Sequence, residues 1–465
     1  MPTALRERPK PFLLPETCKG CGRCIDSCAK HCIEAGTEID PLTGLVPVTL
    51  NLDACNGCGL CMEACPEPYG LRPHVEGADF ELQDPEKLFG EAPVVRPRPE
   101  AIPPQVIPLP PVSPLVLKGN YASAIGALLA GCRHVFGYPI TPSTEGAELM
   151  ARLLPKLDGV FLQAVSEVAT VNMMYGCGGA GLPCMTFTSS PGFSLMLEGI
   201  SYMIGAEVPG VFVNVMRGGP GLGNIAPEQA DVKLVCRGLG HGNTHAIVLA
   251  PSTPQEMLDL TRLAFELTFR YRNPVVVAAD GYLGQMTGKV VLGSTMVRPG
   301  LPEWAVFGDA PHRGNLISSI YLDEKDLETH NAHLNAKYLS MEKEQRADLY
   351  ACADASTLVV AFGTPARMAK GAVEALRAEG HRVGLFRPVT LWPFPIAKLK
   401  ALLPRVERIL VVEASNGQLE DELRLALSKA GLAAPVIQSV RHFGGVLPQS
   451  KEIAAAVRAH AEVAA

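Results

Sequence analysis

Two runs of cysteines with the same spacing constrain this chain more than any other feature of its sequence. Nine of the fourteen cysteines fall between Cys18 and Cys65, and eight of them form the pattern C-x2-C-x2-C-x3-C twice. Three thiols two residues apart can surround one iron–sulfur cubane from a tight turn, whereas zinc sites use paired C-x2-C motifs. The repeat therefore predicts two [4Fe-4S] clusters, with zinc or a disulfide scaffold as the weaker alternatives.

The fourth cysteine of each run is expected to serve the other cluster, as in two-cluster ferredoxins. The two predicted ligand sets are Cys18, Cys21, Cys24 and Cys65 for one cluster, and Cys55, Cys58, Cys61 and Cys28 for the other. Cys32 is a ninth thiol outside the pattern, and we interpret it as a small core residue rather than a ligand. Residues 1–84 are thus predicted to form a small α+β bacterial-type ferredoxin domain.

The negative charge of the chain lies in the same segment as these cysteines. Residues 1–90 hold 8 basic and 14 acidic residues, which accounts for the whole net charge of −6. A content of 47% hydrophobic and 19% charged residues is globular, and there is no basic excess for binding nucleic acid. No signal peptide is recognisable, and the most apolar run, 195–216, is interrupted by Glu198, Glu207 and Pro209. We expect a cytoplasmic protein with no membrane or nucleic-acid partner, whose cysteines are thiolate ligands.

A proline-rich segment follows the cysteine runs. Ten prolines lie between Pro85 and Pro114. Proline fixes φ and lacks an N–H group, so this segment can be neither a helix nor a central strand. The composition predicts a semi-rigid linker over residues 85–117.

Beyond the linker, apolar runs of strand length alternate with segments of helical periodicity, which is typical of a parallel α/β sheet. Residues 184–190 are expected to form a strand, and 210–216 and 273–280 are expected to be buried strands by their uninterrupted apolar runs. Because such sheets bind ligands at the carboxyl ends of their strands, the following loops should outline a polar crevice. These loops are 138–145, 188–193, 216–224 and 280–286. None of them is a nucleotide-binding signature.

Glu167 follows Ser166, which is expected to cap a helix at one of these strand-to-helix junctions. A glutamate in that position is commonly solvated and favours the helix dipole. The helix that follows is rich in alanine and glycine and permits close approach, so this carboxyl could instead hydrogen-bond a cofactor ring nitrogen. The residues alone leave both interpretations open.

Several strings, in the same order, resemble the α-subunit of 2-oxoacid:ferredoxin oxidoreductases. They are GYPITPSTE, SEVATVNMMYGCGGAG, FTSSPGFSLMLEGISYMIGAEVP, RGGPGLG, NPVVVAADGYLGQM, WAVFGDAPHRGNLISSIYLDEKDLETHN and VGLFRPVTLWPFP, across residues 118–450. The N-terminal module resembles the separate ferredoxin-like subunit of those complexes. The resemblance implies an α/β fold: a thiamine-diphosphate pyrimidine-type parallel-sheet domain at 118–290, a connection at 291–345, and a transketolase C-terminal-like α/β domain at 346–465. In that last domain, Gly363, Arg387 and Gln418 lie at strand ends, where we favour domain packing over a functional role.

The resemblance also implies an activity. Members of this family oxidatively decarboxylate a 2-oxoacid on thiamine diphosphate, form acyl-CoA, and pass electrons through [4Fe-4S] clusters to ferredoxin or another acceptor, such as a flavoprotein. Glu167 matches the glutamate that bonds the aminopyrimidine ring of the cofactor, and Tyr138 and Pro139 belong to the same cofactor-binding motif. Thr141 and Arg217 match residues near the substrate carboxylate, although a surface salt bridge is an alternative role for Arg217. The segment after Arg217 departs from the GGPST of many relatives, so the sequence does not decide which 2-oxoacid is the substrate.

One element of a complete thiamine enzyme is missing from the sequence. The Mg²⁺–diphosphate motif begins with G-D-G, and the nearest strings are Gly308-Asp309-Ala310 and Ala279-Asp280-Gly281. We therefore expect a split active site, completed by a β-subunit that carries this motif, in a hetero-oligomer with a γ-subunit. The alternative is a non-catalytic electron-transfer or scaffold subunit of such a complex. An indolepyruvate-type oxidoreductase would have a different domain order.

Overall fold

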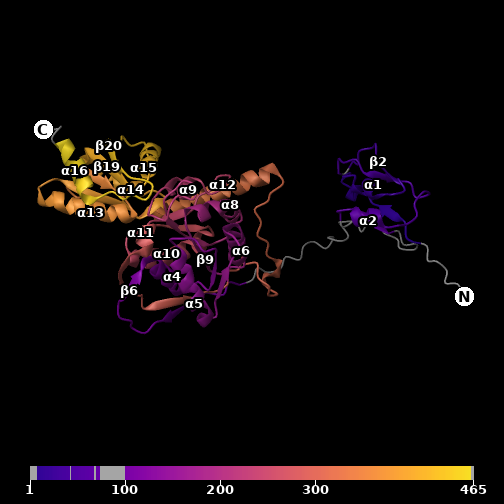
Figure 1. Cartoon of the computed structure of the whole chain (residues 1–465), viewed down its shortest axis with the longest axis horizontal. Helices are drawn as coiled ribbons and strands as arrows, with labels where there is room; N and C mark the ends of the chain where they lie inside the picture. The colour runs from indigo at the N-terminus through magenta and orange to yellow at the C-terminus, as the bar shows by residue number, and fades with distance from the viewer. Residues whose placement is uncertain (1–7, 42, 68–69, 74–99, 462–465) are drawn as a thin grey trace. The chain divides into compact units, whose positions relative to one another are not determined.

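The computed structural model describes residues 8–41, 43–67, 70–73 and 100–461 (Figure 1). The chain divides into two compact units, Met1–Val95 and Arg96–Ala465. In the described part of the chain, none of the helices has both the length and the apolar character needed to span a membrane.

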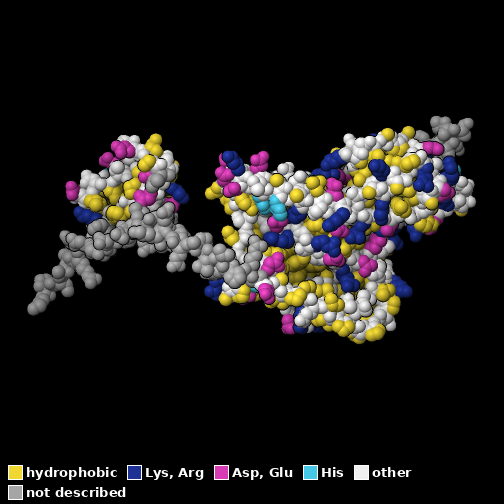
Figure 2. Space-filling view, turned by 180° about the vertical axis from the view of Figure 1, so that it is seen from behind, with side chains coloured by type: hydrophobic (Ala, Val, Ile, Leu, Met, Phe, Trp, Pro, Cys, Tyr) yellow, Lys and Arg dark blue, Asp and Glu magenta, His cyan; other side chains and the backbone are white. Residues whose placement is uncertain are grey.

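Among its described residues, the first unit contains two short α-helices, a turn of 3-10 helix (Pro15–Thr17) and two antiparallel strand pairs. The helices are α1 (Arg23–Ser27) and α2 (Leu60–Ala64); β1 (Pro11–Leu13) pairs with β4 (Leu71–Pro73), and β2 (Ile33–Ala35) with β3 (Val48–Leu50). Its core combines cysteine side chains with Ile33, Val48 and Leu71. Acidic side chains are prominent on the face of this unit that Figure 2 shows. The unit is the small α+β domain that the cysteine repeat predicts.

The second unit contains a seven-stranded sheet in the order β18-β11-β12-β10-β9-β7-β8. Six of these strands are parallel: β7 (His134–Gly137), β8 (Val160–Gln163), β9 (Cys184–Thr188), β10 (Val211–Met216), β11 (Ile247–Leu249) and β12 (Val275–Asp280). Strands β9, β10 and β12 are buried along their whole length, because helices cover both faces of a parallel sheet. All three overlap predicted strands, and for β10 and β12 that prediction came from uninterrupted apolar runs.

The helices of this sheet follow its strands in alternation. They are α4 (Gly119–Leu129), α5 (Thr144–Leu153), α6 (Glu167–Gly179), α7 (Ser190–Leu195), α8 (Leu197–Gly205), α9 (Val232–Arg237), α10 (Pro254–Tyr271) and α11 (Gly281–Gln285). Ser166 caps α6 by accepting a hydrogen bond from the Ala169 N–H at 3.3 Å, as its position predicts.

A smaller sheet, in the order β15-β17-β16-β19-β20, forms the C-terminal part of this unit. Its strands are β15 (Ala347–Tyr350), β16 (Thr357–Val360), β17 (Val383–Pro388), β19 (Arg408–Glu413) and β20 (Val436–Arg441); its helices are α13 (Gly363–Ala378), α14 (Ile396–Lys400), α15 (Gln418–Lys429) and α16 (Ser450–Ala461). The long helix α12 (Glu324–Met341) precedes it. Strand β18 (Thr390–Trp392) belongs to the C-terminal part of the chain but pairs antiparallel with β11 of the larger sheet. One edge strand of the larger sheet therefore comes from the C-terminal part.

The structure differs from the predicted linker at its C-terminal end. Two strands lie in or overlap this segment: β5 (Gln105–Pro108) pairs with β14 (Thr295–Arg298), and β6 (Leu115–Lys118) pairs with β13 (Thr287–Val290). These strands can contain proline because each pair is a two-stranded ribbon. On the side of each strand that faces away from its partner, no backbone N–H is needed for pairing. Residues 85–99 of the predicted linker lie outside the described residues.

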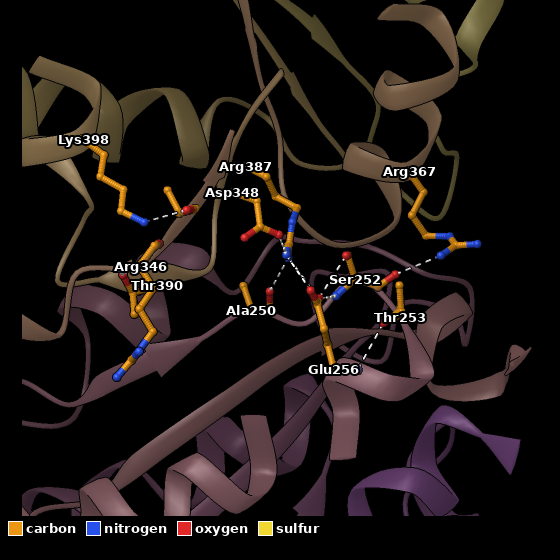
Figure 3. A network of polar contacts seen from close by, with 11 residues as sticks. Ala250, Ser252, Thr253, Glu256, Arg346, Asp348, Arg367, Arg387, Thr390 and Lys398 are labelled. Atoms are coloured by element: carbon orange, nitrogen blue, oxygen red, sulfur yellow. Dashed lines mark hydrogen bonds and ion pairs between the residues drawn. The ribbon is translucent and has the colours of Figure 1, made fainter. Parts of the chain in front are cut away.

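Arg387 lies at the centre of a polar network between the two sheets (Figure 3). Its guanidinium donates to both carboxylate oxygens of Glu256, at 2.6 and 3.1 Å, to the Ala250 carbonyl at 3.4 Å, and to Asp348. The Ser252 N–H and hydroxyl also donate to Glu256, at 2.7 and 3.0 Å. Arg387 therefore packs the C-terminal part against the start of α10.

Gly363 and Gln418 have comparable packing positions. A Cβ at Gly363 would lie 2.8 Å from the Asp280 carboxylate, so a side chain there would separate α13 from β12. The Gln418 amide donates to the Ala230 carbonyl at 2.6 Å and accepts from the Lys233 N–H at 2.9 Å. All three residues contact the larger sheet domain, as the packing interpretation predicts.

Replacing Arg387 by alanine should destabilise the second unit by about 2 kcal/mol, because Glu256 keeps its charge and loses its main partner. The measurement is the urea midpoint followed by far-ultraviolet circular dichroism. Arg458→Ala is the matched control, since Arg458 pairs with Glu379 at an exposed site and should change stability by less than about 1 kcal/mol. Equal effects of both substitutions would contradict the packing role of Arg387.

Candidate functional site

The residues predicted for the cofactor and substrate follow the carboxyl ends of the parallel strands. Tyr138 comes directly after β7, and Arg217 comes directly after β10. Glu167 begins α6, four residues after the end of β8. The chain runs from β7 outward to β8 and then returns to β9 on the other side of β7, which makes this edge a topological switch point. Such points are where open α/β sheets bind ligands.

Arg217 and Thr141 contact each other at this edge. One terminal nitrogen of the Arg217 guanidinium donates to the Thr141 carbonyl at 2.8 Å, and the other donates to the Leu222 carbonyl at 3.2 Å. The Nε of Arg217 is buried and has no hydrogen-bond partner among the described residues. Thr141 itself is exposed and lines a cleft of 610 Å³ with residues that include Glu145 and Tyr282. The guanidinium is thus held in place with donors to spare.

Glu167 is buried as a residue, with a relative exposure of 6%. It forms no hydrogen bond or ion pair within the part of the chain that the structure describes. Helix α7 passes directly against it: a Cβ at Gly192 would lie 2.5 Å from Glu167 Oε1 and 2.5 Å from the Thr188 hydroxyl. The carboxyl oxygens therefore remain available to a hydrogen-bond donor that a ligand supplies.

Tyr138 and Pro139 lie on the surface beside this edge. The Tyr138 side chain is 42% exposed, and Pro139 is exposed as well. These side chains are available to a ligand or to another protein.

The loop after Arg217 is held by a residue that the sequence did not single out. Glu228 is buried and accepts hydrogen bonds from the Gly219 N–H at 2.9 Å and from the Gly444 N–H at 3.1 Å. The Asn224 side chain adds a bond to the Gly444 carbonyl at 3.0 Å. Because Glu228 and Gly444 are 216 residues apart, no local pattern could have revealed this contact.

The two aspartates of the nearest G-D-G-like strings are occupied within the chain. Asp280 accepts from the Thr364 hydroxyl at 2.6 Å and from the N–H groups of Thr364 and Leu283. Burial raises the pKa of Asp280, and these hydrogen bonds oppose the rise. Asp309 accepts from the His312 N–H at 3.1 Å and contacts its ring nitrogen at 2.7 Å. Both carboxylates serve to hold loops and helix starts.

The cysteines of the first unit line two separate cavities. Cys18, Cys21, Cys24 and Cys65 line one, and Cys28, Cys55, Cys58 and Cys61 line the other, together with Cys32. Each cavity thus gathers the thiols of one predicted ligand set, including the cysteine from the opposite run. Within the described residues, no three His, Cys, Asp or Glu side chains converge on a position for a single metal ion.

Backbone N–H groups point at three of these sulfurs. Gly20 donates to Cys18 Sγ at 3.4 Å, Gly57 to Cys55 Sγ at 3.4 Å, and Cys32 to Cys28 Sγ at 3.3 Å. The two glycines have φ values of 65° and 68°, a conformation that glycine adopts most readily. Burial raises the pKa of Cys24 to about 11, so the thiolate form needs a compensating cation.

Comparison with known protein families gives three matches along the chain. Residues 17–68 match a 4Fe-4S dicluster domain, and residues 125–301 match the thiamine-diphosphate-binding domain of pyruvate flavodoxin/ferredoxin oxidoreductase. Residues 355–453 match core domain II of pyruvate:ferredoxin oxidoreductase. The ketoisovalerate oxidoreductase subunit VorB of Methanothermobacter thermautotrophicus is 45% identical over 346 residues, which cover 74% of this chain and 97% of that protein. The chain belongs to the 2-oxoacid:ferredoxin oxidoreductase family.

Other members of this family are also similar along most of their length. The 2-oxoglutarate synthase subunit KorA of Methanocaldococcus jannaschii is 36% identical, over 73% of this chain and 98% of that protein. A solved 2-oxoglutarate:ferredoxin oxidoreductase from Magnetococcus marinus superimposes with a TM-score of 0.66 at 25% identity. That match covers 74% of this chain and 65% of the solved chain. The predicted family and fold class are confirmed, with a thiamine-diphosphate-binding domain and a 4Fe-4S dicluster domain in one chain.

Replacing Glu228 by glutamine should loosen the loop at residues 218–226. The glutamine amide has only one oxygen acceptor, and its NH₂ group would face one of the two backbone N–H groups that Glu228 now binds. The lost hydrogen bond should cost about 1–3 kcal/mol of local stability. Hydrogen exchange followed by mass spectrometry should show at least about tenfold faster exchange in this loop and at 443–446. The control is Glu148→Gln at an exposed position of α5, which should leave both segments unchanged. Unchanged exchange in the Glu228 variant would contradict its role.

Proposed function

We propose that this chain is the α-subunit of a thiamine-diphosphate- and CoA-dependent 2-oxoacid:acceptor oxidoreductase. Such an enzyme converts a 2-oxoacid to acyl-CoA and CO₂ and passes the electrons through [4Fe-4S] clusters to ferredoxin or another acceptor. The observation that carries the proposal is the buried, unpartnered Glu167 at the ligand-binding edge of a sheet in the matched thiamine-diphosphate domain. CoA enters because the similar Magnetococcus structure has coenzyme A and succinyl-CoA bound.

Glu167 fits the pyrimidine side of thiamine diphosphate. When bound, this cofactor supplies a nucleophilic carbon and an electron sink for decarboxylation. The Glu167 carboxyl would hold a proton between its oxygen and the pyrimidine ring nitrogen, which favours the tautomer whose exocyclic nitrogen can act as a base. The close approach of Gly192 leaves little room for water beside that carboxyl. Tyr138 and Pro139 would flank the ring from the β7 loop.

Arg217 fits the carboxylate of a 2-oxoacid. Its guanidinium has five N–H donors, of which two are engaged with backbone carbonyls. The remaining donors can bind a planar carboxylate, and the Thr141 carbonyl fixes the direction in which they point. The Thr141 hydroxyl would bind the same substrate from the cleft side. Together they orient the 2-oxoacid toward the cofactor side of the edge.

The relatives favour a branched-chain 2-oxoacid among the possible substrates. Identity is 45% to a ketoisovalerate oxidoreductase subunit and 36% to a 2-oxoglutarate synthase subunit. A panel of both substrates and an aryl 2-oxoacid, assayed for acyl-CoA, distinguishes these classes.

The two thiol cavities fit two [4Fe-4S] clusters. Each holds the four cysteines of one predicted ligand set and at least one backbone N–H directed at a thiol sulfur, which stabilises the negative charge of a coordinated cluster. The crossed sets, with Cys65 beside the first run and Cys28 beside the second, tie the two halves of the unit together. We assign the complex to the cytoplasm, where thiolates remain reduced.

The site is proposed to be completed by a β-subunit. The relatives of this chain are themselves named as subunits. Asp280 and Asp309 accept internal hydrogen bonds, so neither carboxylate is free to hold Mg²⁺. Apolar side chains are exposed near the site: Val165, two residues before Glu167, is 88% exposed, and Leu222 is 84% exposed. This surface would receive the subunit that carries the Mg²⁺–diphosphate motif, and a γ-subunit would join the same complex.

Glu167→Gln in the complex reconstituted with its β-subunit should lower the turnover of 2-oxoacid by about 10²–10⁴-fold, because the amide cannot hold the proton at the ring nitrogen. The visible absorbance of the clusters should not change. Glu324→Gln is the matched control, since Glu324 is the first residue of α12 and is exposed. Unchanged turnover for Glu167→Gln would favour the scaffold alternative. Acyl-CoA formation by this chain alone would contradict the split site.

The crossed ligand assignment predicts which variants share a spectroscopic effect. Cys65→Ala and Cys18→Ala should perturb the same cluster signal in electron paramagnetic resonance, and Cys28→Ala and Cys55→Ala should perturb the other. Iron should fall from about eight toward about four atoms per chain in each variant. Cys32→Ala is the control and should retain all the iron. A shared effect of Cys18→Ala and Cys28→Ala would instead assign each run to its own cluster.

A further inference from the structure

Two thiols and an imidazole lie together at the amino-terminal edge of the large parallel sheet, away from Glu167. His134 is the first residue of β7 and Cys184 the first residue of β9, and the two are direct partners in the parallel register. Register partners in neighbouring strands point to the same face of a sheet. The Cys184 thiol donates to the Met174 carbonyl at 3.6 Å, which places its sulfur against α6. Cys177 lies on the next turn of that helix.

Cys177 lies beside both partners. Its thiol donates to the Leu182 carbonyl at 3.9 Å, two residues before Cys184, so the two sulfurs lie where α6 and the start of β9 run side by side. Cys184 and His134 are also the neighbours that act on the Cys177 thiol electrostatically. Among the five cysteines between residues 100 and 461, Cys177 is the one that is not buried. The cluster therefore has one partly exposed cysteine and a second, buried cysteine on the neighbouring element.

The charges around these groups favour an anionic Cys177. The neighbouring Cys184 and His134 lower the pKa of Cys177 to about 6, whereas the pKa of His134 is raised mainly by Cys177. Cys184 keeps its proton, because burial and the neighbouring thiolate raise its pKa. Two further groups face the cluster: Arg133, and the buried Cys132, whose pKa is raised to about 12 by burial.

We propose that Cys177 and Cys184 form a peroxide-reactive thiol pair that closes to a disulfide, separate from the clusters and from the cofactor site. The Cys177 thiolate attacks one oxygen of hydrogen peroxide, the O–O bond breaks, and Cys177 becomes a sulfenic acid as hydroxide leaves. The Cys184 sulfur then attacks the sulfenic sulfur, the S–S bond forms, and the hydroxyl leaves with the Cys184 proton as water. The two thiols lose two electrons, and the peroxide gains two.

The disulfide would join two elements that lead to the functional site. Helix α6 begins with Glu167, ten residues and about 15 Å from Cys177, and β9 leads into α7. The pair is therefore outside the catalytic machinery, and its substitution can be studied without removing a residue of that machinery.

The first experiment maps the oxidation products in the full chain. The protein is purified anaerobically with its clusters, treated with limiting hydrogen peroxide, quenched in acid, alkylated and digested without reductant. Mass spectrometry should find the Cys177 and Cys184 peptides joined by a disulfide. In Cys184→Ser, Cys177 should stop at a sulfenic acid that dimedone traps. An unmodified Cys177, or a Cys177 that never joins Cys184 in the wild-type protein, would overturn the proposal.

The second experiment measures how fast iodoacetamide alkylates Cys177 as a function of pH. The midpoint should lie at about 6, and His134→Ala or His134→Gln should move it toward the ordinary value of about 8.5. At pH 7 the rate should exceed that of an ordinary thiol by only about threefold, because a thiolate of lower pKa is also a weaker nucleophile. Buried Cys236 is the internal control and should react slowly. A wild-type midpoint near 8.5, or one unmoved by both His134 variants, would contradict the proposal.

Discussion

The parallel pairing of β7, β9, β10 and β12 is the constraint on which the functional site depends. Strands that run in the same direction end at one edge, so the loops that follow them meet although they are distant in the sequence. The Arg217 guanidinium reaches the Thr141 carbonyl at 2.8 Å across 76 residues for this reason. The absence of a side chain at Gly192 then allows α7 to lie against Glu167, which buries that carboxyl at the same edge.

The C-terminal part of the second unit contributes directly to this edge. Strand β18 extends the large sheet, and one continuous hydrophobic core contains residues from both sheets, such as Val213 and Phe386. Glu228 joins the loop after Arg217 to the loop at Gly444, so this loop rests on both domains. A shared core and shared loop contacts mean that the position of Arg217 depends on the packing between the two domains.

Prediction from the sequence succeeded where a local pattern carries the physical reason. Largely apolar runs predicted β10 and β12 as buried strands, because strands covered on both faces are rich in apolar side chains. The proline-rich segment was predicted only in part: proline excludes helices and central strands but permits a ribbon, and the partner of β5 lies almost 190 residues downstream at β14. Glu228 carried no local signal, because one of its two partners is remote in the sequence.

By itself, the sequence determined the family, the two equivalent runs of thiols, and the order of domains, because each of these is written in spacing or in strings of neighbouring residues. The crossed grouping of Cys65 with the first run and Cys28 with the second was also expected from the sequence, and the two cavities agree with it. Only the tertiary structure decided that Glu167 is buried with no partner among the described residues, and that Cys177 lies beside Cys184 and His134. The spacing of residues within a short segment determines the local conformation of that segment. Proximity between distant residues depends on strand order, register and the packing of a whole core, which no short segment contains.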